Sequence, residues 1–83
     1  MDGITYSTTT NFADVGKHLV KMNDPLWSSP WYLKNVRNGQ YTWTQSAIFA
    51  KEFSLTTAEK HRKALENGAD KDWKAYHDEW ANF

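Results

Sequence analysis

The residues best suited to acid-base or metal chemistry are three histidines, and the sequence keeps them apart. His18, His61 and His77 fall on three different predicted helices. Asp14 and His18 are four residues apart, so on a helix they would share a face and could supply half of a metal site. An exposed ion pair explains the same spacing more simply, and the chain has no HExxH or other zinc-binding spacing. We therefore expect no metal site.

Motifs for nucleophilic catalysis and for phosphate binding are also missing. The chain has no cysteine, which excludes disulfides and thiolate chemistry. Its four glycines stand at positions 3, 16, 39 and 68, so sequence neighbours cannot form a glycine-rich loop around a phosphate. A chain of 83 residues also has little interior in which to build a deep, water-excluding pocket. We expect no catalytic residues, no cofactor and no enzymatic activity.

Aromatic side chains are the unusual feature of the composition. Thirteen of the 83 residues are Trp, Tyr or Phe, and five of these are Trp. A small core needs large side chains, which accounts for some of the rings. So short a chain has few interior places for five indoles, and Trp and Tyr are enriched at the energetically important positions of binding interfaces. We therefore expect some of the rings to lie on the surface and to anchor a partner.

The C-terminal segment is the strongest candidate for such a binding surface. Its aromatic residues recur at spacings of three and four from Trp73 to Phe83, which places them on one face of a predicted helix. Acidic residues surround this stripe and would steer it toward a basic surface, such as the nucleic-acid-binding face of a partner protein. Trp31, expected on the outer face of a hairpin, would add a further anchor. The candidate partner-binding residues are Trp31, Asp72, Trp73, Asp78, Glu79, Trp80 and Phe83.

Charge is balanced over the whole chain but uneven along it. Ten basic residues match ten acidic ones, which argues against a general electrostatic attraction to nucleic acid or anionic lipid. The segment 34–66 is nevertheless basic and includes the cluster Lys60-His61-Arg62-Lys63. Together with the aromatic residues of the hairpin, this composition is typical of surfaces that bind single-stranded nucleic acid. The candidate residues for this alternative are Lys34, Arg37, Lys60, Arg62 and Lys63.

A β-hairpin over residues 31–45 is the clearest structural signal. Asn38-Gly39 supplies the positive φ angles that a two-residue turn requires. This turn predicts that Val36 pairs with Tyr41 and Lys34 with Trp43, although a bulged turn would shift the pairing by one residue. The face expected to meet the core carries Tyr32, Lys34, Val36, Tyr41 and Trp43.

Further elements are expected on both sides of this hairpin. Residues 3–10, expected to form a short edge strand or an extended arm, precede a helix over about 11–22, whose apolar residues form roughly one helical stripe. A helical turn at 46–50 and a short strand at 51–54 follow the hairpin. Thr56 and Glu59 form a capping box for a helix over about 57–67, which Asn67-Gly68 ends, and Asp70 caps a last helix over about 70–81. The chain is thus expected to form a single α+β domain, residues 1–83, with a small antiparallel sheet and three helices.

A short hairpin, an Ala-x-x-Phe step and a helix follow one another between residues 31 and 66. The stretches that carry this pattern are Trp31–Lys34, Asn38–Thr44, Ala50–Phe53 and Thr57–Lys60. The arrangement resembles small orphan proteins of bacteriophages, with the N-terminal helix and the aromatic tail outside the likeness. The resemblance implies a small accessory protein, often non-enzymatic, that binds and redirects or inhibits host machinery. It implies no particular functional residues.

Location and partners follow from the same observations. The longest apolar run, Ala47–Ala50, is far too short to cross a membrane, and no secretory signal is visible. We expect a cytoplasmic protein, in the host cytoplasm if a phage encodes it, with no membrane partner. The leading hypothesis is a non-enzymatic module that modulates or inhibits a host protein, such as a nucleic-acid-handling or defence protein, by occupying its surface. The alternatives are a nucleic-acid-binding accessory protein and a structural homo-oligomer, such as a homodimer, joined through the aromatic tail.

Overall fold

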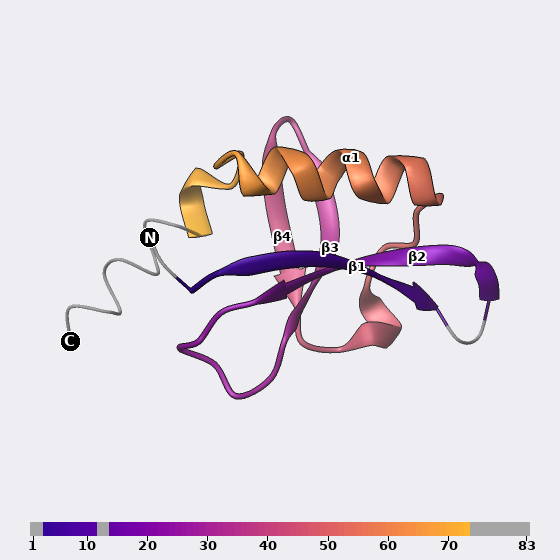
Figure 1. The fold of residues 1–83 in the computed structure, drawn as a ribbon, viewed down its shortest axis with the longest axis horizontal. Helices are drawn as coiled ribbons and strands as arrows, with labels where there is room; N and C mark the ends of the chain where they lie inside the picture. Colours follow the sequence, from indigo (N-terminus) through magenta and orange to yellow (C-terminus); the bar gives the residue numbers. More distant parts are fainter. Residues whose placement is uncertain (1–2, 12–13, 74–83) are drawn as a thin grey trace.

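Four antiparallel strands and one main helix make up this α+β fold (Figure 1). The computed structural model describes residues 3–11 and 14–73. The strands lie in the order β1-β2-β3-β4, so neighbours in the sequence are also neighbours in the sheet. In chain order the elements are β1 (Thr5–Asn11), β2 (Asp14–Asn23), β3 (Trp31–Arg37), β4 (Gln40–Thr44), the 3-10 helix η1 (Ala47–Phe49) and α1 (Leu55–Glu66).

The expectation of a helix over residues 11–22 is wrong, because this stretch forms strand β2. It pairs with the threonine-rich strand β1, from Thr5 opposite Asn23 to Thr10 opposite His18, which confirms the predicted N-terminal strand. The apolar residues of the stretch fit a helical stripe, but Val20 and Met22 are fully buried as alternate residues of a strand. The choice between a helix and a strand is decided by pairing with another segment of the chain, which the local pattern of apolar residues does not reveal.

The described elements include two helices, η1 and α1, instead of the three expected. η1 matches the helical turn predicted at 46–50. Residues 71–73 are helical and end the described range, so the rest of the helix predicted over 70–81 lies outside the described residues. The carboxylate of Asp70 accepts a hydrogen bond of 3.0 Å from the backbone N–H of Trp73, which is the capping contact predicted for Asp70.

The β3–β4 hairpin has the turn that the sequence predicts. Asn38 has a φ of 52° and Gly39 a φ of 77°, the left-handed pair of a tight hairpin turn. Val36 pairs with Tyr41 on the two sides of this turn, which confirms the predicted register at the end of the hairpin.

A β-bulge changes the register farther along the same hairpin. It lies between Leu33 and Asn35, so that Leu33 is opposite Trp43 and Lys34 has no cross-strand partner. The predicted pairing of Lys34 with Trp43 is therefore wrong. Leu33 is fully buried, and Lys34 is exposed and not part of the core face. Because side chains alternate along a strand, Trp31 also faces the core side, not the predicted outer face, and Tyr32 faces outward.

β2 joins the two hairpins through a short contact. Only Lys21 and Met22 pair with β3, opposite Tyr32 and Trp31. Nearer its start, β2 exchanges two backbone hydrogen bonds of 2.8 and 2.9 Å between His18 and Phe53, so the strand predicted over 51–54 is reduced to a single bridge. The hairpins therefore run in steeply different directions, and α1 lies along β1–β2 and across β3–β4 (Figure 1).

α1 begins earlier than predicted and ends where it was predicted to end. Its N-cap is Ser54, whose hydroxyl accepts a hydrogen bond of 3.3 Å from the N–H of Thr57, so Thr56 is a residue of the first turn and not the cap. At the other end Gly68 has a φ of 85°, and the N–H groups of Gly68 and Ala69 bond to the last turn of the helix.

One face of α1 closes the core. Ala58 and Leu65 are buried against Val20 of β2, Leu33 of β3 and Phe53. The partly buried residues Tyr6, Val36, Tyr41 and Trp43 pack around this cluster. The other side of the sheet carries no α-helix within residues 3–11 and 14–73, and we call it the open face.

Candidate functional site

Two of the predicted anchors belong to a cluster of tryptophans that pack against one another. The ring centroid of Trp31 lies 5.3 Å from that of Trp27 and 5.1 Å from that of Trp73, both in edge-to-face contacts. Trp73 also contacts Trp43, at 6.3 Å. Trp31 and Trp73 are partly buried, and their contacts are those of a packed aromatic core.

Two buried carboxylates hold this tryptophan cluster in place. Asp24 is 3% exposed and accepts a hydrogen bond of 2.9 Å from the indole Nε1 of Trp73. Asp70 is 6% exposed and accepts one of 2.6 Å from the indole Nε1 of Trp43. Burial and the nearby charges of Asp70 and Asp24 raise the pKa of Tyr6 to about 12. The cluster thus links the β2–β3 connection, β4 and the segment after α1.

The other predicted anchors divide between the exposed surface and the undescribed tail. Asp72 is exposed on the helical turn 71–73. The residues Asp78, Glu79, Trp80 and Phe83 lie outside the described residues.

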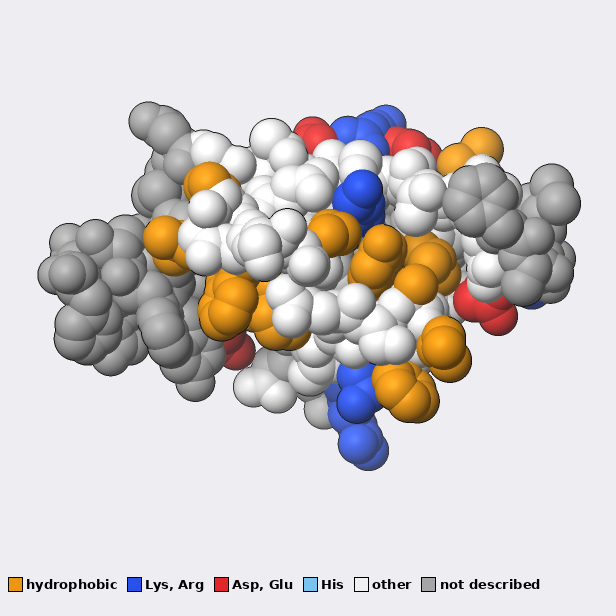
Figure 2. Space-filling model, turned by 90° about the horizontal axis from the view of Figure 1, so that it is seen from below, with side chains coloured by type: hydrophobic (Ala, Val, Ile, Leu, Met, Phe, Trp, Pro, Cys, Tyr) orange, Lys and Arg blue, Asp and Glu red, His pale blue; other side chains and the backbone are white. Residues whose placement is uncertain are grey.

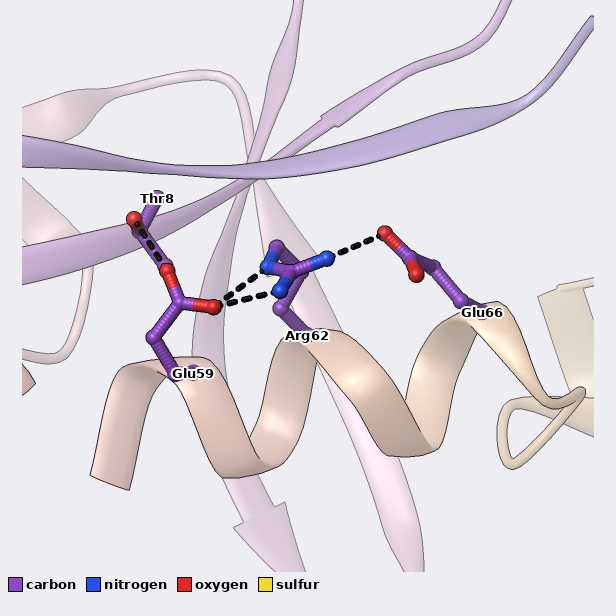
Figure 3. A network of polar contacts seen from close by, with 4 residues as sticks. All are labelled: Thr8, Glu59, Arg62 and Glu66. Atoms are coloured by element: carbon purple, nitrogen blue, oxygen red, sulfur yellow. Dashed lines mark hydrogen bonds and ion pairs between the residues drawn. The ribbon is translucent and has the colours of Figure 1, made fainter. Parts of the chain in front are cut away.

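The predicted nucleic-acid residues lie on two different elements. Lys34 and Arg37 are on β3, whereas Lys60, Arg62 and Lys63 are on α1. Arg62 contacts Glu59 at 2.5 Å and Glu66 at 2.6 Å (Figure 3). Its hydrogen bond lowers the pKa of Glu59. The charge of Arg62 is therefore used within the helix.

Glu59 also joins α1 to the edge strand. Thr8 of β1 donates a hydrogen bond of 3.1 Å to its carboxylate (Figure 3). The network of Thr8, Glu59, Arg62 and Glu66 therefore serves the packing of α1 on β1.

His61 packs against aromatic rings, and His77 lies outside the described residues. His61 lies against Phe53 and Tyr41, with ring centroids 5.1 and 6.3 Å away. Burial, followed by the positive charges of Lys60 and Lys51, lowers the pKa of His61. In the described part of the chain no three His, Asp or Glu side chains are grouped as metal ligands.

Among the described residues, the most exposed large apolar side chains lie on η1. Ile48 is 88% exposed and Phe49 is 67% exposed. η1 lies on the side of β1–β2 opposite α1 (Figure 1), and the view from this side shows hydrophobic side chains gathered on the surface, some of them beside Lys or Arg (Figure 2). Residue types and spacing do not single out this pair as a site, although Ala47–Ala50 is the longest apolar run of the chain. We call Ile48 and Phe49 the η1 pair.

A shallow recess lies at one end of the same molecule. The β2–β3 connection and Gly3 enclose a volume of about 310 Å³, lined in part by Asp24, Pro25 and Trp27. Trp27 is 40% exposed and Leu26 is 45% exposed, so this connection adds apolar surface of its own.

Comparison with protein families, curated proteins and solved structures finds no significant match. Among the described residues, no helix combines the length and the apolar character that a membrane-spanning helix needs.

Proposed function

We propose that this chain is a small, non-enzymatic protein-binding module that acts by occupying a partner's surface. In keeping with the resemblance to phage accessory proteins, the partner would be a host protein in the cytoplasm whose activity the module modulates or inhibits. The observation that carries the proposal is the η1 pair, two neighbouring large apolar side chains exposed to 88% and 67%.

The η1 pair contributes little to the fold and much to a possible interface. Burying an Ile or Phe side chain is worth about 1.5–3 kcal/mol, and at Ile48 and Phe49 the fold leaves most of this free energy unused. Both side chains belong to one short helical turn, so a single partner surface that covers this turn can contact both. Compact apolar anchors of this kind dominate the free energy of many protein interfaces.

The proposal is tested with the double variant Ile48→Ser/Phe49→Ser. The full chain and the variant are each used to capture proteins from a bacterial lysate, and captured proteins are quantified by mass spectrometry. We expect at least one partner to be captured by the unmodified chain and to lose roughly tenfold or more affinity for the variant, while the unfolding midpoint of the variant stays unchanged.

A matched control uses the same chemistry at another exposed position. Leu55, at the start of α1, is 52% exposed, and Leu55→Ser should leave capture intact. A binding role for the η1 pair would be refuted if a partner bound the double variant and the unmodified chain with equal affinity. It would also be refuted if Leu55→Ser weakened capture as much as the double substitution does.

A further inference from the structure

The open face carries a set of lysines around the η1 pair. Val20 packs against α1, so the alternation of a strand points its neighbours Lys17, Leu19 and Lys21 to the opposite side. Leu19 is nevertheless only 5% exposed, which means that other parts of the chain cover it, and η1 lies on this side (Figure 1). Lys17 and Lys21 are separated by about 13 Å along the strand, one on each side of Leu19.

The neighbouring strand adds a third lysine to the open face. Tyr32 of β3 pairs with Lys21 and so points the same way. Lys34 is the exposed residue of the bulge. The backbone N–H of Lys51, two residues after η1, donates a hydrogen bond of 3.0 Å to the carbonyl of Leu33, which fixes the end of η1 beside this bulge.

Most of the acidic side chains that the structure describes are buried or bonded to other groups, and the exposed Asp72 lies on the helical turn 71–73. Among the strand residues whose side chains the structure describes, none that points to this face is Asp or Glu. Asp24 and Asp70 are buried with their indole partners, and Glu59 and Glu66 bind Arg62. Glu52, after η1, accepts a hydrogen bond from Asn11 at the end of β1. In the described part of the chain, Lys17, Lys21 and Lys34 have no ion-pair partner.

We infer that the open face docks a protein partner that presents an apolar recess bordered by Asp and Glu side chains. This inference rests on the proposed function and adds the chemistry of the partner to it. An apolar centre with a charged rim is the usual anatomy of a protein interface. The η1 pair fills the recess, and Lys17, Lys21 and Lys34 meet the acidic border, which speeds association and selects among partners.

A protein partner fits this surface better than a nucleic acid. The phosphate backbone of a nucleic acid would use the lysines but would gain little from an isoleucine that is 88% exposed. Bases stack on exposed aromatic faces, and Tyr32, the aromatic residue of this face in the described strands, is partly buried. Of the described rings, Trp27 and Phe49 are exposed, and of these two only Phe49 belongs to η1.

The test selects ligands for the full chain from a displayed library of short random peptides. We expect enriched peptides to combine Leu, Ile, Phe or Trp with several Asp or Glu residues. Their affinity for the variant Lys17→Glu/Lys34→Glu should fall roughly tenfold at about 0.1 M salt and much less at 1 M, where charges are screened beyond about 3 Å. The matched control Lys60→Glu/Lys63→Glu reverses two exposed lysines of α1 and should leave the affinity unchanged.

The outcomes separate this inference from the proposed function. If no enriched peptide depends on Ile48 and Phe49, the proposed function fails. The peptides could need the η1 pair but not be enriched in Asp or Glu, or they could bind the Lys17/Lys34 variant and the control with equal affinity. Either result would refute the acidic border of the partner and leave the η1 pair as a docking site. If an oligothymidylate binds the open face more tightly than the selected peptides, with the same dependence on Lys17 and Lys34, the partner is a nucleic acid and the inference is overturned.

Discussion

At the scale of single residues, the tryptophans act as hydrogen-bond donors to buried charge as well as apolar filling. The indoles of Trp43 and Trp73 donate to Asp70 and Asp24 over 2.6 and 2.9 Å. Hydrogen bonds to a charged group are stronger than bonds between neutral groups, and a buried carboxylate that loses its donor is costly. The Nε1 of Trp31, in contrast, is buried and has no hydrogen-bond partner within the described residues.

This difference predicts unequal effects of two matched substitutions. Trp43→Phe and Trp31→Phe each remove part of an indole, but only the first removes the donor of Asp70. We expect Trp43→Phe to lower the free energy of unfolding by about 1–3 kcal/mol more than Trp31→Phe does. Urea unfolding of the two variants measures the difference, and equal losses would mean that the bond to Asp70 adds nothing to stability.

The site illustrates what residue types alone can and cannot predict. The abundance of aromatic rings indicated correctly that some would lie outside the core, since Trp27 is 40% exposed. It could not indicate which ones, and Trp31 and Trp73 proved to be packed against each other at 5.1 Å. Ile48 and Phe49 could not be predicted as exposed, because the type of an apolar residue does not indicate whether the fold buries it.

At the scale of elements, the start of α1 depends on a serine that the sequence pattern does not favour. The pattern Thr56-x-x-Glu59 predicts a cap at Thr56, but Glu59 bonds to Thr8 and Arg62 instead. The cap is Ser54, which directly follows the residue that bridges to β2. The position at which the chain leaves the sheet therefore sets the start of the helix.

The two capping assignments make opposite predictions. Ser54→Ala should lower the free energy of unfolding by about 1 kcal/mol, because the N–H of Thr57 loses its acceptor. Thr56→Ala should change stability little, since Thr56 is exposed and lies within the first turn. Denaturation midpoints of the two variants decide between the caps, and a larger loss for Thr56→Ala would restore the capping box.

Elements defined by local chemistry were predictable, whereas β2 and the bulge in β3, which depend on distant partners, were not. Asn38-Gly39 and Asn67-Gly68 determine their turn and helix end within a few residues, and both are present. β2 becomes a strand because β1 pairs with it, and its own apolar spacing fits a helix as well. The bulge at Lys34 allows Leu33 and Val36, three residues apart, both to pack on the core side of the sheet. No short sequence pattern expresses this requirement.

At the scale of the whole molecule, the two sides of the sheet have different roles. α1 and the core residues cover one side, and the tryptophan cluster joins the ends of the elements to it. The open face combines the η1 pair with lysines. The described acids are buried or bonded to other groups, except Asp72, which is exposed on the helical turn 71–73. A net charge of zero over the chain thus conceals a basic and apolar surface, which we assign to a partner.

Hydrogen-deuterium exchange of the chain, free and bound to its captured partner, tests this assignment most directly. In the free chain the N–H groups of Phe49 and Ala50 donate long hydrogen bonds, of 3.1 and 3.3 Å, to carbonyl groups within the same short turn. These N–H groups should therefore exchange quickly. The account predicts that binding slows exchange at residues 47–50 and leaves the exposed side of α1 unchanged. Protection confined to α1, with residues 47–50 exchanging as fast as in the free chain, would contradict it.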